Sequence, residues 1–396
     1  MINEKMRGLG AKRSVIRELF EYGKIRKAQI GEENVYDFSL GNPSVPAPDC
    51  VNENLVKILK EESSILVHGY TSAQGDANVR QAIADYINKT QGTAFGKDDL
   101  YMTVGAAAAL TCSLTAVVNS GEEVIVLAPY FPEYKVFIER CGGVVREVLS
   151  DTVTFQPDFE RLASAINEKT AAIIINSPNN PTGAVITEDN IKKLCDLLHQ
   201  AELKYNKPIY IICDEPYREL VFGDANVAYV PKFYKNTLVC YSFSKSLSLP
   251  GERIGYVLVP PCMDDAKFVY QAICGAGRAL GFVCAPSLLQ KLIPSCLGKT
   301  ADISIYDTNR KLLLEKLTEY GFTVVKPDGA FYLFLKSPVE DANEFCEKAK
   351  EFEIIFVPSD DFGCKGYVRI SYCVKTEQIE QALPAFKKLA ESYNLI

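Results

Sequence analysis

Four short runs of consecutive apolar, mostly β-branched residues lie in the middle of the chain. They are Val124–Ala128 (VIVLA), Ala171–Ile175 (AAIII), Ile209–Cys213 (IYIIC) and Leu238–Tyr241 (LVCY). Continuous apolar runs of this length are typical of parallel strands that are buried on both faces. A helix-spaced apolar set separates two of the runs: Ile191, Leu194, Leu198 and Ala201. The pattern predicts an α/β protein whose mostly parallel sheet is flanked by helices.

The pattern changes beyond about residue 290, where helices and strands alternate in a different order. A helix, two strands, a second helix, two more strands and a last helix are expected there, which is typical of a smaller α+β domain. With 396 residues, the chain is longer than one hydrophobic core usually holds. We therefore expect a large domain over residues 46–285 and a small domain built from residues 1–45 and 286–396. The amphipathic segment that ends near Gly41 is expected to pack against the small domain.

Charge and composition narrow the class of protein. A net charge of -7 gives no basic surface for a nucleic acid. The charged N-terminus does not resemble a signal peptide, and no apolar stretch is long enough to span a membrane, so we expect a cytoplasmic protein. The thirteen cysteines are expected to be reduced, and only His68 and His199 are available as histidine ligands. No metal site is predicted, and the chemistry has to come from Lys, Asp, Tyr, Arg and Asn.

A polar cluster follows each of the four apolar runs. The clusters are APYFPEY, NSPNNPTG, DEPY and SFSK, in chain order. Ligands of open parallel sheets bind just beyond the carboxyl ends of the strands, so the four clusters are expected to converge on one site.

Lys245, Asp214 and Tyr217 are the candidate catalytic residues of this site. A lysine in a desolvated pocket can form a Schiff base with an aldehyde cofactor and act as a base near neutral pH. Asp214 follows a buried strand, where a cationic partner such as a pyridinium nitrogen would stabilise its charge. Tyr217 can donate a hydrogen bond to a ring oxygen. The alternatives are a surface lysine, an aspartate that caps a helix and a tyrosine that only packs.

A phosphate group has a candidate site at the start of a predicted helix. Gly105 allows the backbone N–H groups of Ala106 and Ala107 to approach an anion at the positive end of the helix dipole. Ser242 and Arg253, on either side of Lys245, would complete the phosphate site. The alternatives are an ordinary alanine-rich buried helix and an exposed arginine.

Three further side chains are candidates for binding a planar cofactor or its substrate. Asn180 can donate its amide to an oxygen of the ring or of the substrate, although an ordinary turn explains the same sequence. Phe131 can stack on a ring, or it can belong to the core. Arg369 in GYVRISY can bind a substrate carboxylate with two parallel hydrogen bonds, or it can be a surface charge.

Taken together, these motifs resemble class I aminotransferases of the aspartate aminotransferase superfamily, which are pyridoxal phosphate enzymes of fold type I. The resemblance covers nearly the whole chain, from FSLGNP near residue 40 through HGYTSAQGD, NSPNNPTG, DEPY and SFSKSLSLPGERIG to YVRIS. It implies a large domain with a mostly parallel sheet of the seven-stranded type, a smaller α+β domain and pyridoxal 5'-phosphate as the cofactor.

The resemblance also implies a role for each candidate residue. Lys245 would form the Schiff base with the cofactor and move the proton of the substrate α-carbon. Asp214 would pair with the pyridine nitrogen, Tyr217 and Asn180 would bind the ring oxygen, and Phe131 would stack on the ring. The phosphate would be held by Ser242, Arg253 and the backbone of Ala106 and Ala107.

Two further implications concern the partner subunit and the substrate. Tyr70 matches a tyrosine that reaches the phosphate of the neighbouring subunit, which implies a homodimer with shared active sites. Arg369 and the backbone of Gly41 would bind the substrate α-carboxylate. Some bacterial relatives bind a distal carboxylate with a lysine at the position of Ala107, and this sequence lacks that lysine. Arg278 lies in a predicted loop at the dimer interface and would take the place of that lysine. The donor would then be aspartate or another dicarboxylic amino acid, with 2-oxoglutarate as an acceptor. The alternative is that Arg278 forms an ordinary salt bridge at the interface or on the surface.

Other functions were weighed against this interpretation. The segment Gly275–Gly281 suggests a nicotinamide-dependent dehydrogenase, but it lacks the third glycine at the spacing that this motif requires, and no clear strand precedes it. A transcription regulator with an aminotransferase-like domain needs a DNA-binding domain, for which about forty N-terminal residues are too few. A pyridoxal phosphate-dependent β-lyase remains the alternative, because the same lysine and ring serve both reactions.

Overall fold

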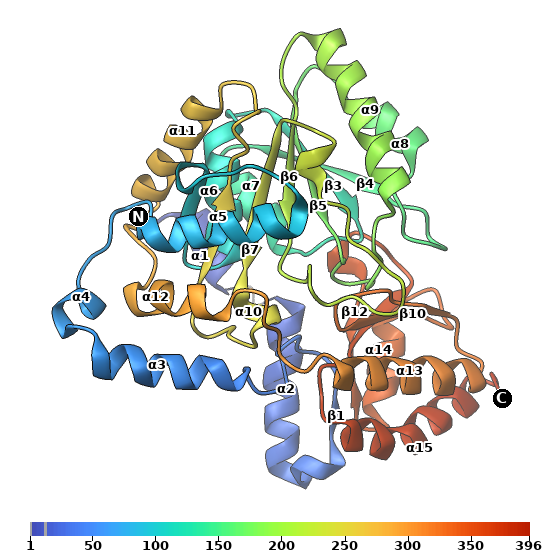
Figure 1. The fold of residues 1–396 in the computed structure, drawn as a ribbon. Coiled ribbons are helices and arrows are strands. Elements are labelled where there is room, and N and C mark those ends of the chain that lie inside the picture. Colours follow the sequence, from blue (N-terminus) through green and yellow to red (C-terminus); the bar gives the residue numbers. More distant parts are fainter. Residues whose placement is uncertain (1, 12–13) are drawn as a thin grey trace.

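The computed structural model describes residues 2–11 and 14–396, and a seven-stranded sheet forms its main layer (Figure 1). The strand order is β2-β8-β7-β6-β5-β3-β4. Neighbouring strands from β7 to β4 are parallel, whereas β8 is antiparallel to both β7 and β2. The strands are β2 Leu100–Thr103, β3 Glu123–Ala128, β4 Val144–Leu149, β5 Thr170–Asn176, β6 Tyr210–Asp214, β7 Thr237–Ser242 and β8 Gly255–Leu258. The prediction of an α/β protein with a mostly parallel sheet is confirmed.

The four apolar runs of the sequence form β3, β5, β6 and β7, and successive residues of each strand face opposite sides of the sheet. In β6, Ile212 packs in one apolar cluster with α6, α7 and α11. Its neighbours Ile211 and Cys213 belong to a second cluster with α8 and α9 on the other side. Both faces of the strand are therefore covered by helices, which explains why the runs are continuously apolar.

Helices cover both faces of the sheet along its length (Figure 1). One face carries α6 Ala106–Val117, α7 Glu133–Arg140 and α11 Ala266–Ala279. The other face carries α8 Phe159–Ala165, α9 Glu188–Tyr205 and α5 Ala77–Gln91. Next to α5, three helices share its apolar cluster: α3 Asp49–Glu61, α4 Ser64–His68 and α12 Ser287–Cys296.

A second, four-stranded sheet follows near the C-terminus, with the order β12-β13-β10-β9 and antiparallel pairs. Its strands are β9 Val324–Val325, β10 Tyr332–Lys336, β12 Val357–Pro358 and β13 Tyr367–Ser371. The accompanying helices are α13 Ser304–Glu319, α14 Ala342–Lys350 and α15 Thr376–Ser392. This sheet shares a large apolar cluster with α13, α14 and α15, separate from the clusters of the main sheet.

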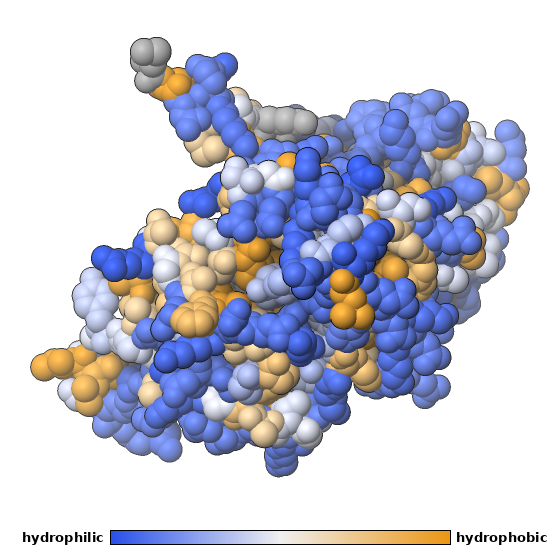
Figure 2. All heavy atoms as spheres, turned by 90° about the horizontal axis from the view of Figure 1, so that it is seen from above, coloured by the Kyte–Doolittle hydropathy of each residue, from blue (hydrophilic) through white to orange (hydrophobic). Residues whose placement is uncertain are grey.

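The N-terminal segment reaches both parts of the molecule. Strand β1 (Tyr36–Asp37) pairs in parallel with β11 (Ile354–Ile355), and Leu19 of α2 (Val15–Ile30) packs against Ile355. Helix α1 (Glu4–Ala11) has no buried residue, and Figure 2 shows it projecting from the body of the molecule. Its Lys5 lies 3.8 Å from Glu139 of α7. Helix α1 is therefore held by surface contacts and adds nothing to the core.

Hydrophilic side chains dominate the face that Figure 2 shows, with hydrophobic side chains in small groups between them. Among the described residues, no helix combines the length and the apolar character that crossing a membrane requires.

Candidate active site

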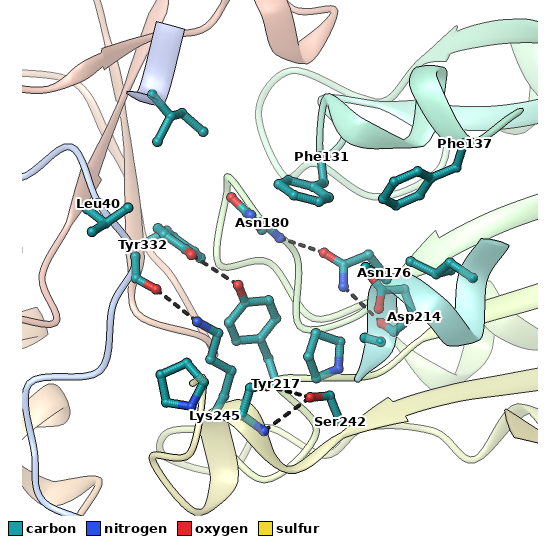
Figure 3. Close-up of a pocket in the computed structure, with 18 of the residues that line it drawn as sticks. Leu40, Phe131, Phe137, Asn176, Asn180, Asp214, Tyr217, Ser242, Lys245 and Tyr332 are labelled. Atoms are coloured by element: carbon teal, nitrogen blue, oxygen red, sulfur yellow. Dashed lines mark hydrogen bonds between the residues drawn. The ribbon is translucent and has the colours of Figure 1, made fainter. Parts of the chain in front are cut away.

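A cavity of about 280 Å³ lies where the carboxyl ends of the parallel strands face the four-stranded sheet (Figure 3). Most of the residues that the sequence singled out line it: Gly41, Ala106, Ala107, Phe131, Asn180, Asp214, Tyr217, Ser242, Lys245, Arg253 and Arg369. They come from the ends of five strands (β2, β3, β5, β6 and β7) or the segments just after them, from the N-terminal segment and from β13. The strand-end clusters therefore converge, as parallel strands require.

Lys245 lies in α10 (Phe243–Ser246), a short helix that begins directly after β7. Its Nζ donates a hydrogen bond of 2.8 Å to the carbonyl oxygen of Gly41 (Figure 3). Burial lowers the pKa of the Lys245 amine to about 8, and the nearby charges of Arg369 and Arg253 act in the same direction. A desolvated amine of this kind is a nucleophile and a base near neutral pH.

Asp214 is the last residue of β6, and its carboxylate is buried among the strand ends. Tyr134 donates a hydrogen bond of 2.5 Å to Oδ2, but Oδ1 is buried and has no partner among the described residues. Burial raises the pKa of Asp214 to about 7, although the bond from Tyr134 opposes this shift. A cationic donor would stabilise the ionised form of this buried carboxylate, so this part of the cavity is suited to a protonated nitrogen.

The start of α6 forms another part of the cavity wall, which is suited to an anion. Ala106 is the first residue of the helix, so its N–H group lies at the positive end of the dipole. Gly105 has a φ of 90°, and a Cβ atom there would lie 2.8 Å from Nη2 of Arg253. The hydroxyl groups of Ser242 and Ser244 are 2.6 Å apart and line the same cavity. Backbone amides, hydroxyl groups and a guanidinium together suit a phosphate group.

Arg369 reaches the cavity from β13 and is only 2% exposed. Its Nη1 donates to Oδ1 of Asn180 at 3.0 Å and its Nη2 donates to the carbonyl oxygen of Ser39 at 2.6 Å. The Nε atom is buried without a partner in the described chain, and burial lowers the pKa of this guanidinium. A buried guanidinium with unused hydrogen-bonding capacity is suited to a carboxylate ligand.

Tyr217 and Tyr332 face each other across the cavity, with their hydroxyl groups 3.0 Å apart (Figure 3). Burial raises the pKa of both phenols, that of Tyr332 to about 12. Both therefore stay protonated and can donate hydrogen bonds to a ligand oxygen. Tyr332 also stacks below Arg369, whose guanidinium lies 4.7 Å from the centre of its ring.

Gly105 directly precedes the lining residues Ala106 and Ala107, whereas two other candidate residues lie away from this cavity in their own chain. Tyr70 is 94% exposed. Arg278 is also exposed, and the structure corrects its expected place in a loop, because it lies in the last turn of α11. The helix continues through Gly275 and Gly277 because the apolar residues Val269, Ile273 and Ala276 recur at helical spacing on its buried face. Gly277 also belongs to that face, where a Cβ atom would lie 2.0 Å from the hydroxyl oxygen of Tyr101.

The sequence analysis did not single out several residues that contribute to the site, although three of them stand in the polar clusters at the strand ends. Tyr134 stands in APYFPEY, Asn176 begins NSPNNPTG and Ser244 lies in SFSK, so all three belong to the strand-end clusters. The side chain of Asn176 donates to the carbonyl oxygen of Asp214 at 2.8 Å and thereby joins two strand ends. Tyr332 stands in an aromatic strand with nothing polar to distinguish it.

The residues present fit pyridoxal phosphate. The unpaired Oδ1 of Asp214 suits the protonated ring nitrogen, and the start of α6 with Ser242 and Arg253 suits the phosphate. Lys245 would supply the amine for the aldehyde. Among the described residues, no group of three or more His, Cys, Asp or Glu side chains is placed to hold a metal ion.

A mostly parallel sheet covered by helices on both faces, with a desolvated lysine and a buried arginine lining one cavity beside its strand ends, is the arrangement expected of an enzyme that transfers amino groups. The family model for aminotransferase class I and II matches residues 33–386, and the chain belongs to this family. The activity of the family, amino-group transfer, is therefore that of this protein.

Individual relatives support the same conclusion. A probable aspartate/prephenate aminotransferase of Aquifex aeolicus is 31% identical over 93% of this chain and 94% of its own length. A crystal structure of an amino transferase from Eubacterium rectale is 56% identical with a TM-score of 0.98, covering 100% of this chain and 99% of its own. Aspartate aminotransferase from Thermus thermophilus with maleate has a TM-score of 0.85 at 27% identity, over 97% and 98% of the two chains.

Proposed function

We propose that this aminotransferase uses pyridoxal 5'-phosphate to take the amino group of an L-amino acid and give it to a 2-oxo acid such as 2-oxoglutarate. One observation carries the proposal: the desolvated amine of Lys245, the unpaired oxygen of Asp214 and the guanidinium of Arg369 line a single cavity. When bound, the cofactor supplies an aldehyde that accepts amino groups and a ring that withdraws electrons.

The chain's own residues then have separate tasks. Lys245 holds the cofactor and moves the proton at the substrate α-carbon, which its lowered pKa allows near neutral pH. Asp214 keeps the ring nitrogen protonated. Arg369 binds the α-carboxylate and fixes the orientation of the substrate, and the N–H group of Gly41 adds to this carboxylate site. Phe131, Asn180 and Tyr217 position the ring.

The preferred donor is proposed to be aspartate or another dicarboxylic amino acid. The names of the Aquifex and Thermus relatives support this preference. Within one chain, however, the remaining wall is apolar and includes Ile16, Leu40 and Phe137. A distal carboxylate therefore needs a cation from elsewhere, and we assign this role to Arg278 of a second subunit.

A homodimer in the cytoplasm is part of the proposal. The fully exposed Tyr70 supports it, together with the exposed apolar side chains of Ile65 and Leu66 on α4. Three neighbouring exposed side chains of this kind are suited to contact with a second copy of the chain.

A direct test uses the purified protein loaded with pyridoxal phosphate and single amino acids in the presence of 2-oxoglutarate. Transamination predicts that glutamate forms in an amount equal to the new 2-oxo acid, with the fastest turnover for aspartate. A β-lyase would instead release ammonia and pyruvate from cysteine or a related amino acid without any need for 2-oxoglutarate. The second outcome would overturn the proposed reaction.

A further inference from the structure

A second cavity of about 450 Å³ lies on the face of the sheet that carries α5, and it is larger than the cavity around Lys245. It is bounded by Ile83 and Ile87 of α5, by Tyr241 of β7 and Tyr256 of β8, and by the segment that follows β6. Thr90, Asn226 and Lys232 are lining residues that are exposed to solvent. The cavity is therefore accessible to a small molecule.

The segment after β6 contributes to both cavities. Asp214, Pro216 and Tyr217 line the cavity around Lys245, whereas Glu215, Arg218 and Glu219 line the second cavity. The second cavity is therefore a separate space behind the catalytic one.

The lining includes two carboxylates, Glu215 and Glu219, and two cations, Arg218 and the exposed Lys232, but not all of their polar atoms have hydrogen-bond partners in the described chain. Arg218 and Glu215 form an ion pair of 3.0 Å, and the guanidinium of Arg218 also lies 4.9 Å from the centre of the Tyr229 ring. Glu219 accepts a hydrogen bond of 2.9 Å from Tyr241 at Oε1 only. Its Oε2 is buried and accepts no hydrogen bond from the described residues. Oε2 of Glu219 is thus left for a ligand to satisfy, and Nη1 of Arg218, although it is ion-paired with Glu215, also has no hydrogen-bond partner among the described residues.

The hydroxyl group of Tyr229 is a further unpaired polar group that supports a ligand site here. Tyr229 is 6% exposed, and its hydroxyl group has no hydrogen-bond partner in the described chain. Burying a hydroxyl group or a carboxylate oxygen without a partner costs roughly 1–3 kcal/mol each, so both atoms favour a bound molecule that satisfies them. Burial also raises the pKa of Glu219 to about 7, against the lowering effect of its bond from Tyr241. A cationic ligand would stabilise the ionised carboxylate.

Aromatic rings form much of the remaining wall. They belong to Tyr86, Tyr229, Tyr241, Phe243 and Tyr256. The rings of Tyr241 and Tyr256 stack with their centres 5.0 Å apart, and Phe243 meets Tyr241 edge to face. Rings of this kind beside a carboxylate attract ammonium groups by cation–π and charge interactions.

We propose that this cavity binds a small organic cation, an ammonium group on an apolar or aromatic body, with Glu219 as its counter-ion. The ammonium group lies against Oε2 of Glu219 and the hydroxyl group of Tyr229. The apolar body packs on the aromatic rings and on Ile83 and Ile87.

Calorimetric titration of the cofactor-loaded enzyme with phenyltrimethylammonium tests the proposal, because a quaternary ammonium cannot react with an aldehyde. We expect saturable binding, no binding of benzyl alcohol or benzoate at the same site, and a loss of affinity of about tenfold or more in Glu219→Gln. Glu160→Gln is the matched control, because Glu160 is exposed on α8 and the substitution changes the net charge equally. This control is expected to bind like the wild type.

Tyr229→Phe provides a second variant that keeps the ring and removes the unpaired hydroxyl group. It is expected to bind phenyltrimethylammonium within about threefold of the wild type, and to lose more affinity for phenethylammonium, which has N–H donors. Phenethylammonium binding is measured on enzyme whose cofactor has been fixed to the protein by borohydride. Absence of binding up to about 10 mM, or equal binding by wild type and Glu219→Gln, overturns the proposal.

Discussion

Arg369 donates a hydrogen bond of 3.0 Å from Nη1 to Oδ1 of Asn180 and thereby joins the two sheets of the molecule. Arg369 belongs to β13 of the four-stranded sheet, and Asn180 follows β5 of the seven-stranded sheet. The bond holds the guanidinium in the cavity around Lys245, and Nε has no partner among the described residues. The geometry of the proposed carboxylate site therefore depends on the contact between the two sheets.

Replacing Arg369 by Lys is the first prediction. A lysine keeps the charge but cannot bond Asn180, Ser39 and a carboxylate in one plane. We expect kcat/KM to fall for every amino acid donor, because all of them carry the α-carboxylate. The loss of transition-state stabilisation calculated from kcat/KM should be about 2–4 kcal/mol. Steady-state kinetics with several donors provide the measurement, and Arg7→Lys on exposed α1 is the control. A loss confined to dicarboxylic donors would contradict the assignment of Arg369 to the α-carboxylate.

Lys245→Ala is expected to abolish turnover and to leave a folded protein that still holds pyridoxal phosphate noncovalently. The phosphate and ring contacts do not involve the lysine, which supplies the covalent link and the proton transfer. In the wild type, borohydride reduction should fix the cofactor to the peptide that contains Lys245, as mass spectrometry would show. Attachment to any other lysine would refute the assignment.

The third prediction concerns Asp214→Asn. The amide has the size of the carboxylate and can still accept a hydrogen bond from Tyr134, so the fold should be preserved. It cannot keep the ring nitrogen protonated in a desolvated site, and most of the rate should be lost. Activity within about threefold of the wild type, a barrier difference of under ~0.7 kcal/mol, would show that Asp214 is not the partner of the ring nitrogen.

The lowered pKa of Lys245 leads to a prediction about pH. Burial lowers this pKa from 10.5 to about 8, and only the unprotonated amine can capture an aldehyde. The cofactor-free protein should therefore capture pyridoxal phosphate faster as the pH rises through about 8, with a plateau above that value. Stopped-flow absorbance gives the rate constant at each pH. A profile that still rises steeply at pH values near 10 would mean that the amine is not desolvated.

An element or a site residue could be predicted from the sequence only where a short stretch of chain carries the pattern that marks it. The strands β3, β5, β6 and β7 were predictable because burial on both faces requires an unbroken apolar run. Lys245 and Asp214 were predictable as candidates because both stand in the polar clusters that follow such apolar runs, Asp214 in DEPY and Lys245 in SFSK. Tyr332 was not, because its contact with Tyr217 joins residues 115 positions apart and no local pattern records it.

Arg278 shows a second limit of the sequence. Its two neighbouring glycines favour a loop, yet the buried face of α11 stabilises a helix through this position. Tertiary packing outweighed the local propensity. The division into domains at residues 45 and 285 stays a prediction. Helix α12 begins at Ser287 and packs with α3 and α5, so the chain returns to the main sheet after that boundary.

The last prediction tests whether Arg278 determines the preference for a dicarboxylic donor. Arg278 is exposed and outside the cavity of its own chain, so it can act only on the active site of a second subunit. A guanidinium there would supply the cation that the apolar wall of Ile16, Leu40 and Phe137 lacks. Arg278→Ala should then reduce kcat/KM for aspartate and glutamate. The corresponding loss of transition-state stabilisation should be about 2–4 kcal/mol, as expected when one member of a buried charge pair is removed.

Alanine and aromatic donors carry no distal carboxylate, so their kcat/KM values should change far less in Arg278→Ala. Comparing the two donor classes within one variant separates this role from a general loss of stability or of dimer contacts, which would affect all donors alike. Arg278→Lys is the matched variant: it keeps the charge and should recover part of the activity toward aspartate but not the full value, because a lysine cannot bind the carboxylate with two parallel bonds. A uniform loss across all donors, or no loss, would leave Arg278 as an interface or surface residue and would remove the structural basis for preferring aspartate.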